Sequence, residues 1–157
     1  MSLEFSPEGL KKFEAIVARY PKKEAAMLPV LYLAQEEFGY LSEEAIAYVA
    51  NLMEQSPARV RGVVTFYTML NTRPVGRHHI QVCRTLSCAL AGSENITRFI
   101  TSNLGVAPGE TTPDGRFTLS EVECLASCGT APMMQINDDY YEGLTEKKVS
   151  EILASLK

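Results

Sequence analysis

Several features that define common protein classes are scarce or missing in this sequence of 157 residues. It contains no tryptophan, and none of its four cysteines lies in the first 82 residues. Its longest apolar run lies around residues 28–34 and is far shorter than the ~18 residues that a membrane-spanning helix requires. With 15 basic against 19 acidic residues, it also lacks the positive excess on which nucleic-acid binding depends. We therefore expect neither direct membrane insertion nor a nucleic-acid partner.

Targeting and nucleotide-binding motifs are missing as well. The first nine residues include Glu4 and Glu8 and lack the basic and then apolar layout of a secretory signal. The sequence has no Gly-x-Gly-x-x-Gly fingerprint and no phosphate-binding Gly-Lys-Ser/Thr. We expect an intracellular chain, in a compartment that keeps thiols reduced, that binds neither NADH nor flavin by itself.

The first 70 residues carry helical signals. Each of three serines precedes an apolar pattern of helical spacing, as a helix N-cap does: Ser6, Ser42 and Ser56. Another helix is expected from about Glu24 to Phe38, with Leu28 on its buried side and Gly39 as its stop. The first helix is expected to end at Pro21. These patterns predict a small helical bundle.

After the turn-forming stretch at residues 71–76, strand patterns appear. The sequence predicts strands near residues 79–82, 117–122, 133–136 and 140–141, with helices over 96–104 and from residue 145. The order strand, helix, strand, strand, strand, helix is typical of a small α/β layer. We therefore predict an α/β chain with an N-terminal helical bundle over residues 1–72 and an α/β domain over residues 73–157.

The four cysteines are the strongest candidates for chemistry. Cys83 and Cys88 have four residues between them, and Cys124 and Cys128 have three. Each pair is expected to straddle a loop at the end of a strand, so two loops at one sheet edge can present four thiolates. Structural zinc accepts four thiolates at such spacing, and so does a [2Fe-2S] cluster. Spacing leaves both interpretations open, whereas disulfides are disfavoured by a reducing compartment.

The residues around the cysteines favour a redox function. Ala126, Ser127 and Gly129 are small, which lets backbone N–H groups approach sulfur and tune a potential. Glu121 and Glu123 lie close in sequence, with Arg84 as the nearby cation. Because an added electron is unfavourable near negative charge, a cluster here is expected to have a low potential.

At this point the residues resemble a known family. The segments VCRTLSC at residues 82–88 and EVECLASCGTAP at 121–132 look like the cluster loops of the thioredoxin-like [2Fe-2S] ferredoxins. More closely, the chain resembles the electron-transfer subunits of that family in respiratory NADH-quinone oxidoreductase, complex I. Further matching segments follow in the same order across nearly the whole chain: AQEEFGYL at 34–41, GVVTFYTM at 62–69, TPDGRF at 112–117 and NDDYY at 137–141.

The resemblance implies that Cys83, Cys88, Cys124 and Cys128 bind one [2Fe-2S] cluster in a thioredoxin-like domain. It implies a place in the peripheral arm of the complex, on the cytoplasmic face of the bacterial inner membrane. The implied partners are the flavin- and NADH-binding subunit, which carries FMN and NADH, and other peripheral-arm iron-sulfur subunits. The implied activity is exchange of single electrons with that flavin, as a subunit of an oxidoreductase. One departure is Ala126, where the family commonly has glycine.

Two other functions remain open. The chain could serve as the equivalent diaphorase subunit of a soluble NAD-dependent hydrogenase or formate dehydrogenase. It could also be a zinc-stabilised structural adaptor, which predicts a colourless protein.

Three smaller groups of residues are further candidates for a functional role. His78 and His79 precede Cys83 on a strand, and because adjacent strand residues face opposite ways, we expect no ligand role for the pair. Phe66 and Met69 fit a partner surface or a core equally well. Of the neighbours Tyr140 and Tyr141, one is expected to be exposed.

Overall fold

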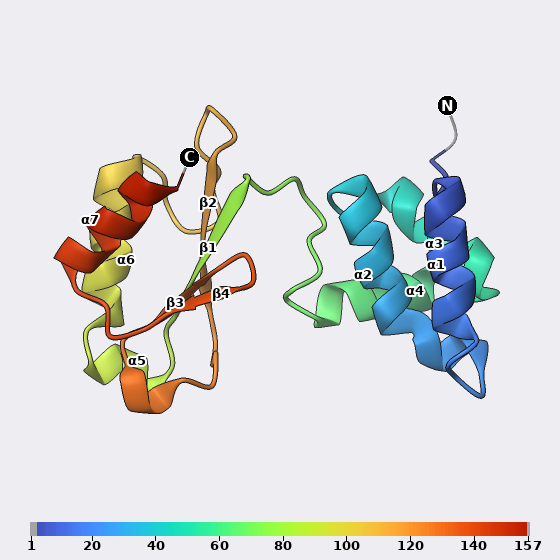
Figure 1. Cartoon of the computed structure of the whole chain (residues 1–157), viewed down its shortest axis with the longest axis horizontal. Coiled ribbons are helices and arrows are strands. Elements are labelled where there is room, and N and C mark those ends of the chain that lie inside the picture. The colour runs from blue at the N-terminus through green and yellow to red at the C-terminus, as the bar shows by residue number, and fades with distance from the viewer. Residues whose placement is uncertain (1–2, 157) are drawn as a thin grey trace. The chain divides into compact units, whose positions relative to one another are not determined.

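The structure, a computed structural model, describes residues 3–156. Contacts divide it into two compact units, with the boundary between Pro74 and Val75 (Figure 1). Each unit has a hydrophobic core of its own. None of the helices in residues 3–156 has the length and apolar character needed to cross a bilayer.

The first unit is helical. Its elements are α1 (Pro7–Val17), the 3-10 helix η1 (Lys23–Ala26), α2 (Met27–Phe38), α3 (Glu43–Met53) and α4 (Pro57–Phe66). The three serine caps are confirmed. Ser6 Oγ accepts a hydrogen bond from the Gly9 N–H at 2.9 Å, and the Ser42 and Ser56 hydroxyls accept equivalent bonds.

Two predicted helix boundaries in this unit were wrong. The first helix ends at Val17 rather than at Pro21, and two turn bonds carry the chain through Tyr20. The helix expected from Glu24 begins instead with η1, and α2 starts at Met27. This start places Pro29 in the first turn of α2, where its missing N–H leaves no hydrogen bond unmade.

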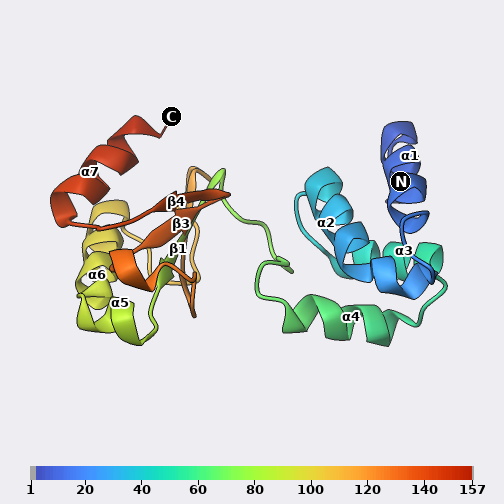
Figure 2. The same ribbon diagram turned by 60° about the horizontal axis from the view of Figure 1, so that its bottom comes forward.

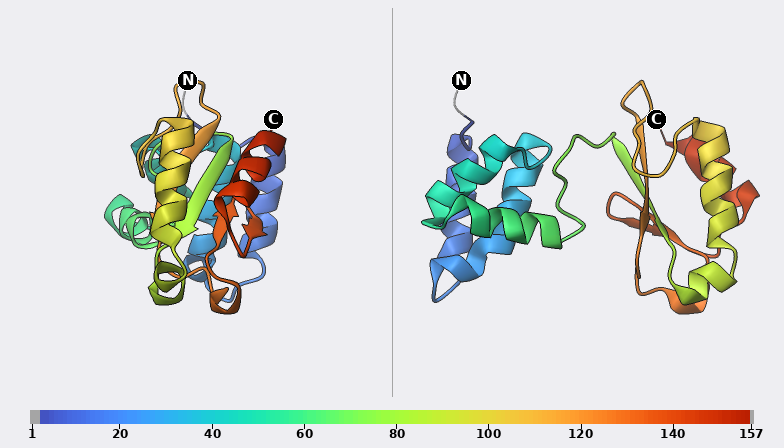
Figure 3. Two further views of the ribbon diagram at one scale, coloured as in Figure 1. Left: turned by 90° about the vertical axis from the view of Figure 1, so that its left-hand side faces the viewer. Right: turned by 180° about the vertical axis from the view of Figure 1, so that it is seen from behind.

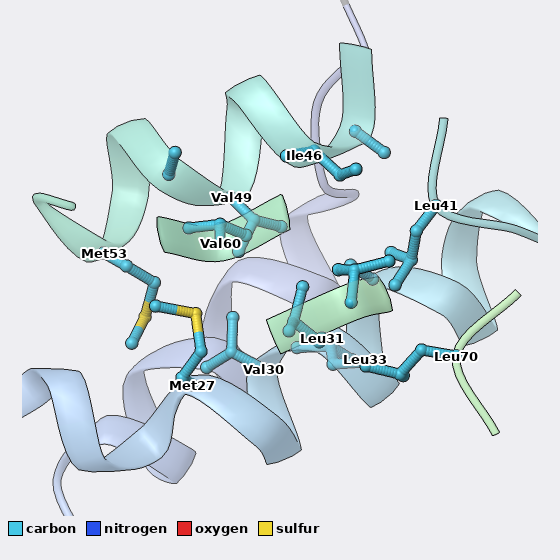
Figure 4. Packing of buried hydrophobic residues seen from close by; sticks show 14 of the residues in the cluster. Met27, Val30, Leu31, Leu33, Leu41, Ile46, Val49, Met53, Val60 and Leu70 are labelled. Atoms are coloured by element: carbon cyan, nitrogen blue, oxygen red, sulfur yellow. The ribbon is translucent and has the colours of Figure 1, made fainter. Parts of the chain in front are cut away.

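The core of this unit lies between α2, α3 and α4 (Figure 4). Leu31, Val49 and Val60 are fully buried there, and Leu41 and Met53 are nearly so. Leu28, predicted to be buried, is only partly buried at the edge of this core. Met27 and Val30 take the inner face of α2 instead.

The second unit contains a four-stranded sheet in the order β2-β1-β3-β4. Its strands are β1 (His78–Cys83), β2 (Phe117–Val122), β3 (Met134–Ile136) and β4 (Asp139–Tyr141). β1 pairs with β2 in parallel, whereas β3 pairs antiparallel with both β1 and β4. The other elements are α5 (Leu86–Leu90), α6 (Ser93–Leu104), η2 (Cys128–Thr130) and α7 (Glu146–Ser155).

The sheet has an apolar face and a polar face. Ile80 lies beside Leu119 and Ile136 in the strand register, and all three are buried in the core with Ile100 of α6. Figures 1 and 3 show α6 and α7 on the same face of the sheet, and Figure 2 shows the short α5 beside α6. Because side chains alternate along a strand, the polar His79 projects to the other face. The predicted order of strands and longer helices is confirmed.

Candidate metal centre

The four predicted ligands lie at the end of the sheet where β1 and β2 both finish. Cys83 is the last residue of β1, and Cys124 and Cys128 follow β2. Because β1 and β2 are parallel neighbours with Cys83 opposite Val122, the segments that leave them start at the same edge. The Arg84 N–H donates to the Val122 carbonyl at 3.0 Å and holds the two segments together.

The prediction that both cysteine pairs straddle a loop was wrong for Cys88. That residue lies in the middle of α5, a helix of five residues that no pattern indicated. A helix this short does not show a helical period in its sequence. The helix buries Cys88 to 2% exposure, and Cys83 is equally buried at 3%, whereas Cys124 and Cys128 are exposed.

Hydrogen bonds prepare the Cys83 sulfur for ionisation. Burial alone raises the pKa of this thiol, but donors outweigh it and lower the pKa below its usual range: the Thr85 hydroxyl, the Leu125 and Thr85 N–H groups, and Cys88. The Thr85 Oγ1 lies 3.2 Å from the Cys83 Sγ. A hydrogen bond from Leu125 places the Cys124 segment directly beside Cys83.

Cys88 has the opposite tendency. Burial and the contact with Cys83 raise the pKa of its thiol, and the charge of Cys128 adds to the rise, against one opposing bond from the Met133 N–H. The fully buried Met133 packs against both Cys83 and Cys88 and keeps water from their inner side. These contacts bring Cys128 close to the buried pair, in agreement with the contact between α5 and η2.

The loop that carries Cys124 and Cys128 is held by its own polar groups. The Ala126 N–H donates to the Cys124 Sγ at 3.3 Å. Ala126 itself has φ +61°, in the left-handed region that favours glycine. The sequence departure at this position therefore falls on a residue with unusual backbone geometry.

The donor set fits an iron-sulfur cluster. All four cysteines are free, and a [2Fe-2S] core takes four thiolates, two on each iron. Backbone N–H groups of Leu125, Met133 and Ala126 already point at sulfur atoms, as such a centre requires. Within residues 3–156, no three His, Cys, Asp or Glu side chains gather tightly enough to hold a single metal ion.

Charged residues near the site set its local field. Arg84 Nη2 lies 2.6 Å from the Glu123 carboxylate, and both side chains are largely exposed. Glu121 acts on Arg84 through its charge and without a hydrogen bond to it. One guanidinium therefore faces two carboxylates, and the low reduction potential expected from the sequence stays a prediction.

The remaining candidates lie away from the cysteines. His79 Nε2 is 2.8 Å from the Ser120 Oγ, and the His78 ring lies 5.4 Å from that of Phe117, at the opposite end of β1 from Cys83. Tyr140 is exposed and Tyr141 is partly buried, as expected.

The segment after α4 is a surface and not a core. Phe66 is 76% exposed and Met69 is 44% exposed. Gln35 fixes this segment, because its amide donates to the Met69 carbonyl and accepts from the Asn71 N–H at 2.6 Å. The core role considered for Phe66 and Met69 is therefore wrong.

Comparison with known proteins assigns the class. The family described as thioredoxin-like [2Fe-2S] ferredoxin matches residues 13–157, and the chain belongs to this family. The resemblance inferred from the cysteine segments is confirmed, and with it the predicted fold class. Membership indicates a [2Fe-2S] cluster as the cofactor.

The chain is similar over most of its length to subunits of NADH-quinone oxidoreductases. A subunit of the NADH-quinone oxidoreductase of Rickettsia prowazekii (strain Madrid E) is 47% identical over 95% of this chain and 86% of the relative. The corresponding subunit of the same enzyme from Rhizobium meliloti (strain 1021) is 42% identical over 94% of this chain and 88% of the relative.

A solved structure shares the fold. A crystal structure of NAD+-reducing [NiFe]-hydrogenase in the air-oxidized state matches with a TM-score of 0.73 at 20% identity. The match covers 83% of this chain and 22% of the hydrogenase chain.

Proposed function

We propose that this chain is an iron-sulfur electron-transfer subunit of an NADH-quinone oxidoreductase. The observation that supports the proposal is that four free cysteines follow two parallel strands that end at the same sheet edge, in a chain 47% identical to a subunit of such an enzyme. Cys83, Cys88, Cys124 and Cys128 would hold one [2Fe-2S] cluster. When bound, the cluster supplies reversible one-electron chemistry.

The chain's own residues set how readily an electron is accepted. N–H groups of Leu125 and Met133 donate to the buried sulfurs and favour added negative charge. The carboxylates of Glu121 and Glu123 oppose added charge, and Arg84 offsets only Glu123 directly. Met133 and the partly buried Leu125 shield the inner side of the site from water. We expect the balance to favour a low reduction potential.

The electron partner would be a flavin on a neighbouring subunit. The sequence carries no phosphate-binding glycine motif, which supports FMN and NADH being bound by that subunit and not by this chain. Other iron-sulfur subunits of the peripheral arm would complete the assembly. Its place would be peripheral, at the cytoplasmic face of the bacterial inner membrane.

Metal analysis of anaerobically purified protein tests the cofactor. We expect about two irons and two sulfides per chain, a brown colour, and a rhombic EPR signal after dithionite reduction. One zinc without sulfide, persisting after attempted cluster reconstitution, would instead make the chain a zinc-stabilised structural adaptor.

Replacement of one ligand tests the site residues. Cys124→Ser is expected to lose or strongly alter the visible and EPR spectra, while the helical unit keeps its far-UV circular dichroism. Ser87→Ala, a change of similar size near Cys88, is the control and should keep both spectra. An unaltered [2Fe-2S] spectrum in Cys124→Ser would refute this ligand.

The parent complex has one rival. The fold is shared with an NAD+-reducing hydrogenase, so a soluble hydrogenase or formate dehydrogenase remains the alternative. Affinity purification of the tagged chain separates the two. Recovery of membrane-arm proteins supports the quinone reductase, whereas a hydrogenase or molybdenum subunit would overturn it.

A further inference from the structure

Glu142 lies just after β4 and contacts the loop of the second cysteine pair. Its half-buried carboxylate accepts hydrogen bonds from the Ser127 and Thr130 hydroxyls, the latter at 2.7 Å. The two hydroxyls lie 2.8 Å from each other. Ser127 precedes Cys128, and Thr130 ends the 3-10 helix that begins at Cys128. One carboxylate thus accepts hydrogen bonds from residues on both sides of this cysteine.

The backbone at Glu142 is also held in place. The Gly143 N–H donates to the Thr130 carbonyl at 2.7 Å, which fastens the same turn through the backbone. Lys148 Nζ of α7 donates to the Glu142 carbonyl oxygen. The turn that carries Cys128 is therefore tied to the β4–α7 connection.

Cys128 needs such support more than the buried cysteines do. Cys83 is fixed by the sheet and Cys88 by the core, both with exposures of 3% or less. Cys128 is exposed and lies in a 3-10 helix of three residues. A helix this short has little stability of its own.

We infer that Glu142 is a positioning residue for the [2Fe-2S] site, which holds the Ser127–Thr130 turn so that Cys128 stays in place as a ligand. This inference rests on the proposed function. The hydroxyl of Ser127, then that of Thr130, also lowers the pKa of the Glu142 carboxyl, so the acceptor is charged at neutral pH.

Two substitutions separate the geometry from the charge. Glu142→Ala removes the acceptor, so we expect release of iron to a chelator to become faster, on the order of ten-fold. Glu142→Gln keeps a side-chain oxygen that can accept from Ser127 and Thr130, so we expect it to recover most of the wild-type release rate. Glu146→Ala, at an exposed carboxylate in the first turn of α7, is the control and should leave the rate unchanged.

A second measurement uses the full chain without its cluster. In Glu142→Ala the amide hydrogens of Thr130 and Gly143 should exchange several-fold faster than in wild type, whereas the core amide of Leu119 should not change. Faster exchange at Leu119 too would show that Glu142→Ala has lost the fold in general. The iron-release rate of Glu142→Gln would then be the test, with a near wild-type rate supporting the inference and a rate as fast as that of Glu142→Ala contradicting it. Wild-type iron release and exchange in Glu142→Ala would overturn the inference.

The two proposals fail in different ways. If wild-type protein binds zinc and no sulfide, the proposed function fails whatever the exchange results are. If wild type holds the cluster but Glu142→Ala retains it equally well, only the positioning role fails.

Discussion

Ala126, in the loop between Cys124 and Cys128, has a left-handed backbone conformation that is unfavourable for alanine. An alanine at φ +61° is about 1–2 kcal/mol less stable than in the right-handed region. Glycine has no such penalty, although it gains freedom in the unfolded chain. We expect Ala126→Gly to raise the free energy of unfolding of the second unit by up to about 1 kcal/mol, as measured by urea denaturation.

The control is an alanine in an ordinary helical position. Ala154→Gly on the exposed side of α7 should lower the free energy of unfolding by about 0.5–1 kcal/mol. A loss of stability in Ala126→Gly of the same size as in Ala154→Gly would show that the left-handed conformation carries no cost.

We expect His79 to make the free energy of unfolding depend on pH. Burial lowers the pKa of its imidazole below the ordinary 6.5, and its Nε2 lies 2.8 Å from the Ser120 hydroxyl. The unfolded chain therefore binds the proton more readily than the folded chain does. The contribution of neutral His79 to the free energy of unfolding is complete above about pH 6.5, and it is lost as the pH falls through the pKa of the folded chain.

The measurement compares wild type with His79→Gln. The cluster-free chain is unfolded with urea at several pH values between about 7.5 and 5.5. This pH range lies above the one in which carboxylates titrate. We expect the free energy of unfolding to fall with decreasing pH in wild type and to fall less in the variant. Parallel pH dependences of the two proteins would contradict the assignment to His79.

At the scale of elements, α6 is attached to the sheet by its apolar face. Ile100 is fully buried between this helix and the strands. Ile100→Ala should lower the free energy of unfolding of the second unit by about 2–5 kcal/mol, because it leaves a cavity in a packed core. Leu90→Ala on α5, where the side chain is 81% exposed, should change it by less than about 0.5 kcal/mol. Equal effects in thermal unfolding would contradict this view of the core.

The accuracy of the sequence predictions also differed between elements. β2 was placed correctly because its alternation is bounded by the Pro113-Asp114-Gly115 turn signal. α5 was missed because its five residues are fewer than two helical turns. The start of α2 was misplaced because residues 23–26 form a 3-10 helix, which is too short to show a period of its own that would separate it from the α-helix that follows.

At the scale of the whole molecule, the two units have separate cores. We propose that they are separate domains, over residues 1–72 and 73–157, that unfold in separate transitions. Leu31→Ala, at a fully buried position of the first core, should lower the stability of the helical transition by about 2–5 kcal/mol. The loss of visible cluster absorption should keep its wild-type midpoint.

The reciprocal variant completes this test. Ile100→Ala should shift the cluster transition and leave the helical transition unchanged. A single transition that both variants shift equally would show that the chain unfolds as one cooperative body.

Much of the candidate site could be predicted from the sequence, but its supporting contacts could not. The cysteine segments identified the family because they are contiguous in the chain, and the parallel pairing of β1 and β2 brings their ends to one edge. Glu142 gave no signal, since it lies outside both cysteine segments and its role depends on contacts with Ser127 and Thr130.

The sequence alone determined what is local: the helix caps at Ser6, Ser42 and Ser56, the alternation of the longer strands, and the cysteine spacing. Each of these depends on residues within a turn or a strand of one another, so the order along the chain contains the information. Only the tertiary structure decided that Cys83 and Cys88 are buried while Cys124 and Cys128 are exposed, and that Phe66 faces solvent. It alone also brings the Glu142 carboxylate within hydrogen-bond distance of the turn that carries Cys128. These properties depend on which segments pack together, because burial and long-range hydrogen bonds exist only once the chain has folded.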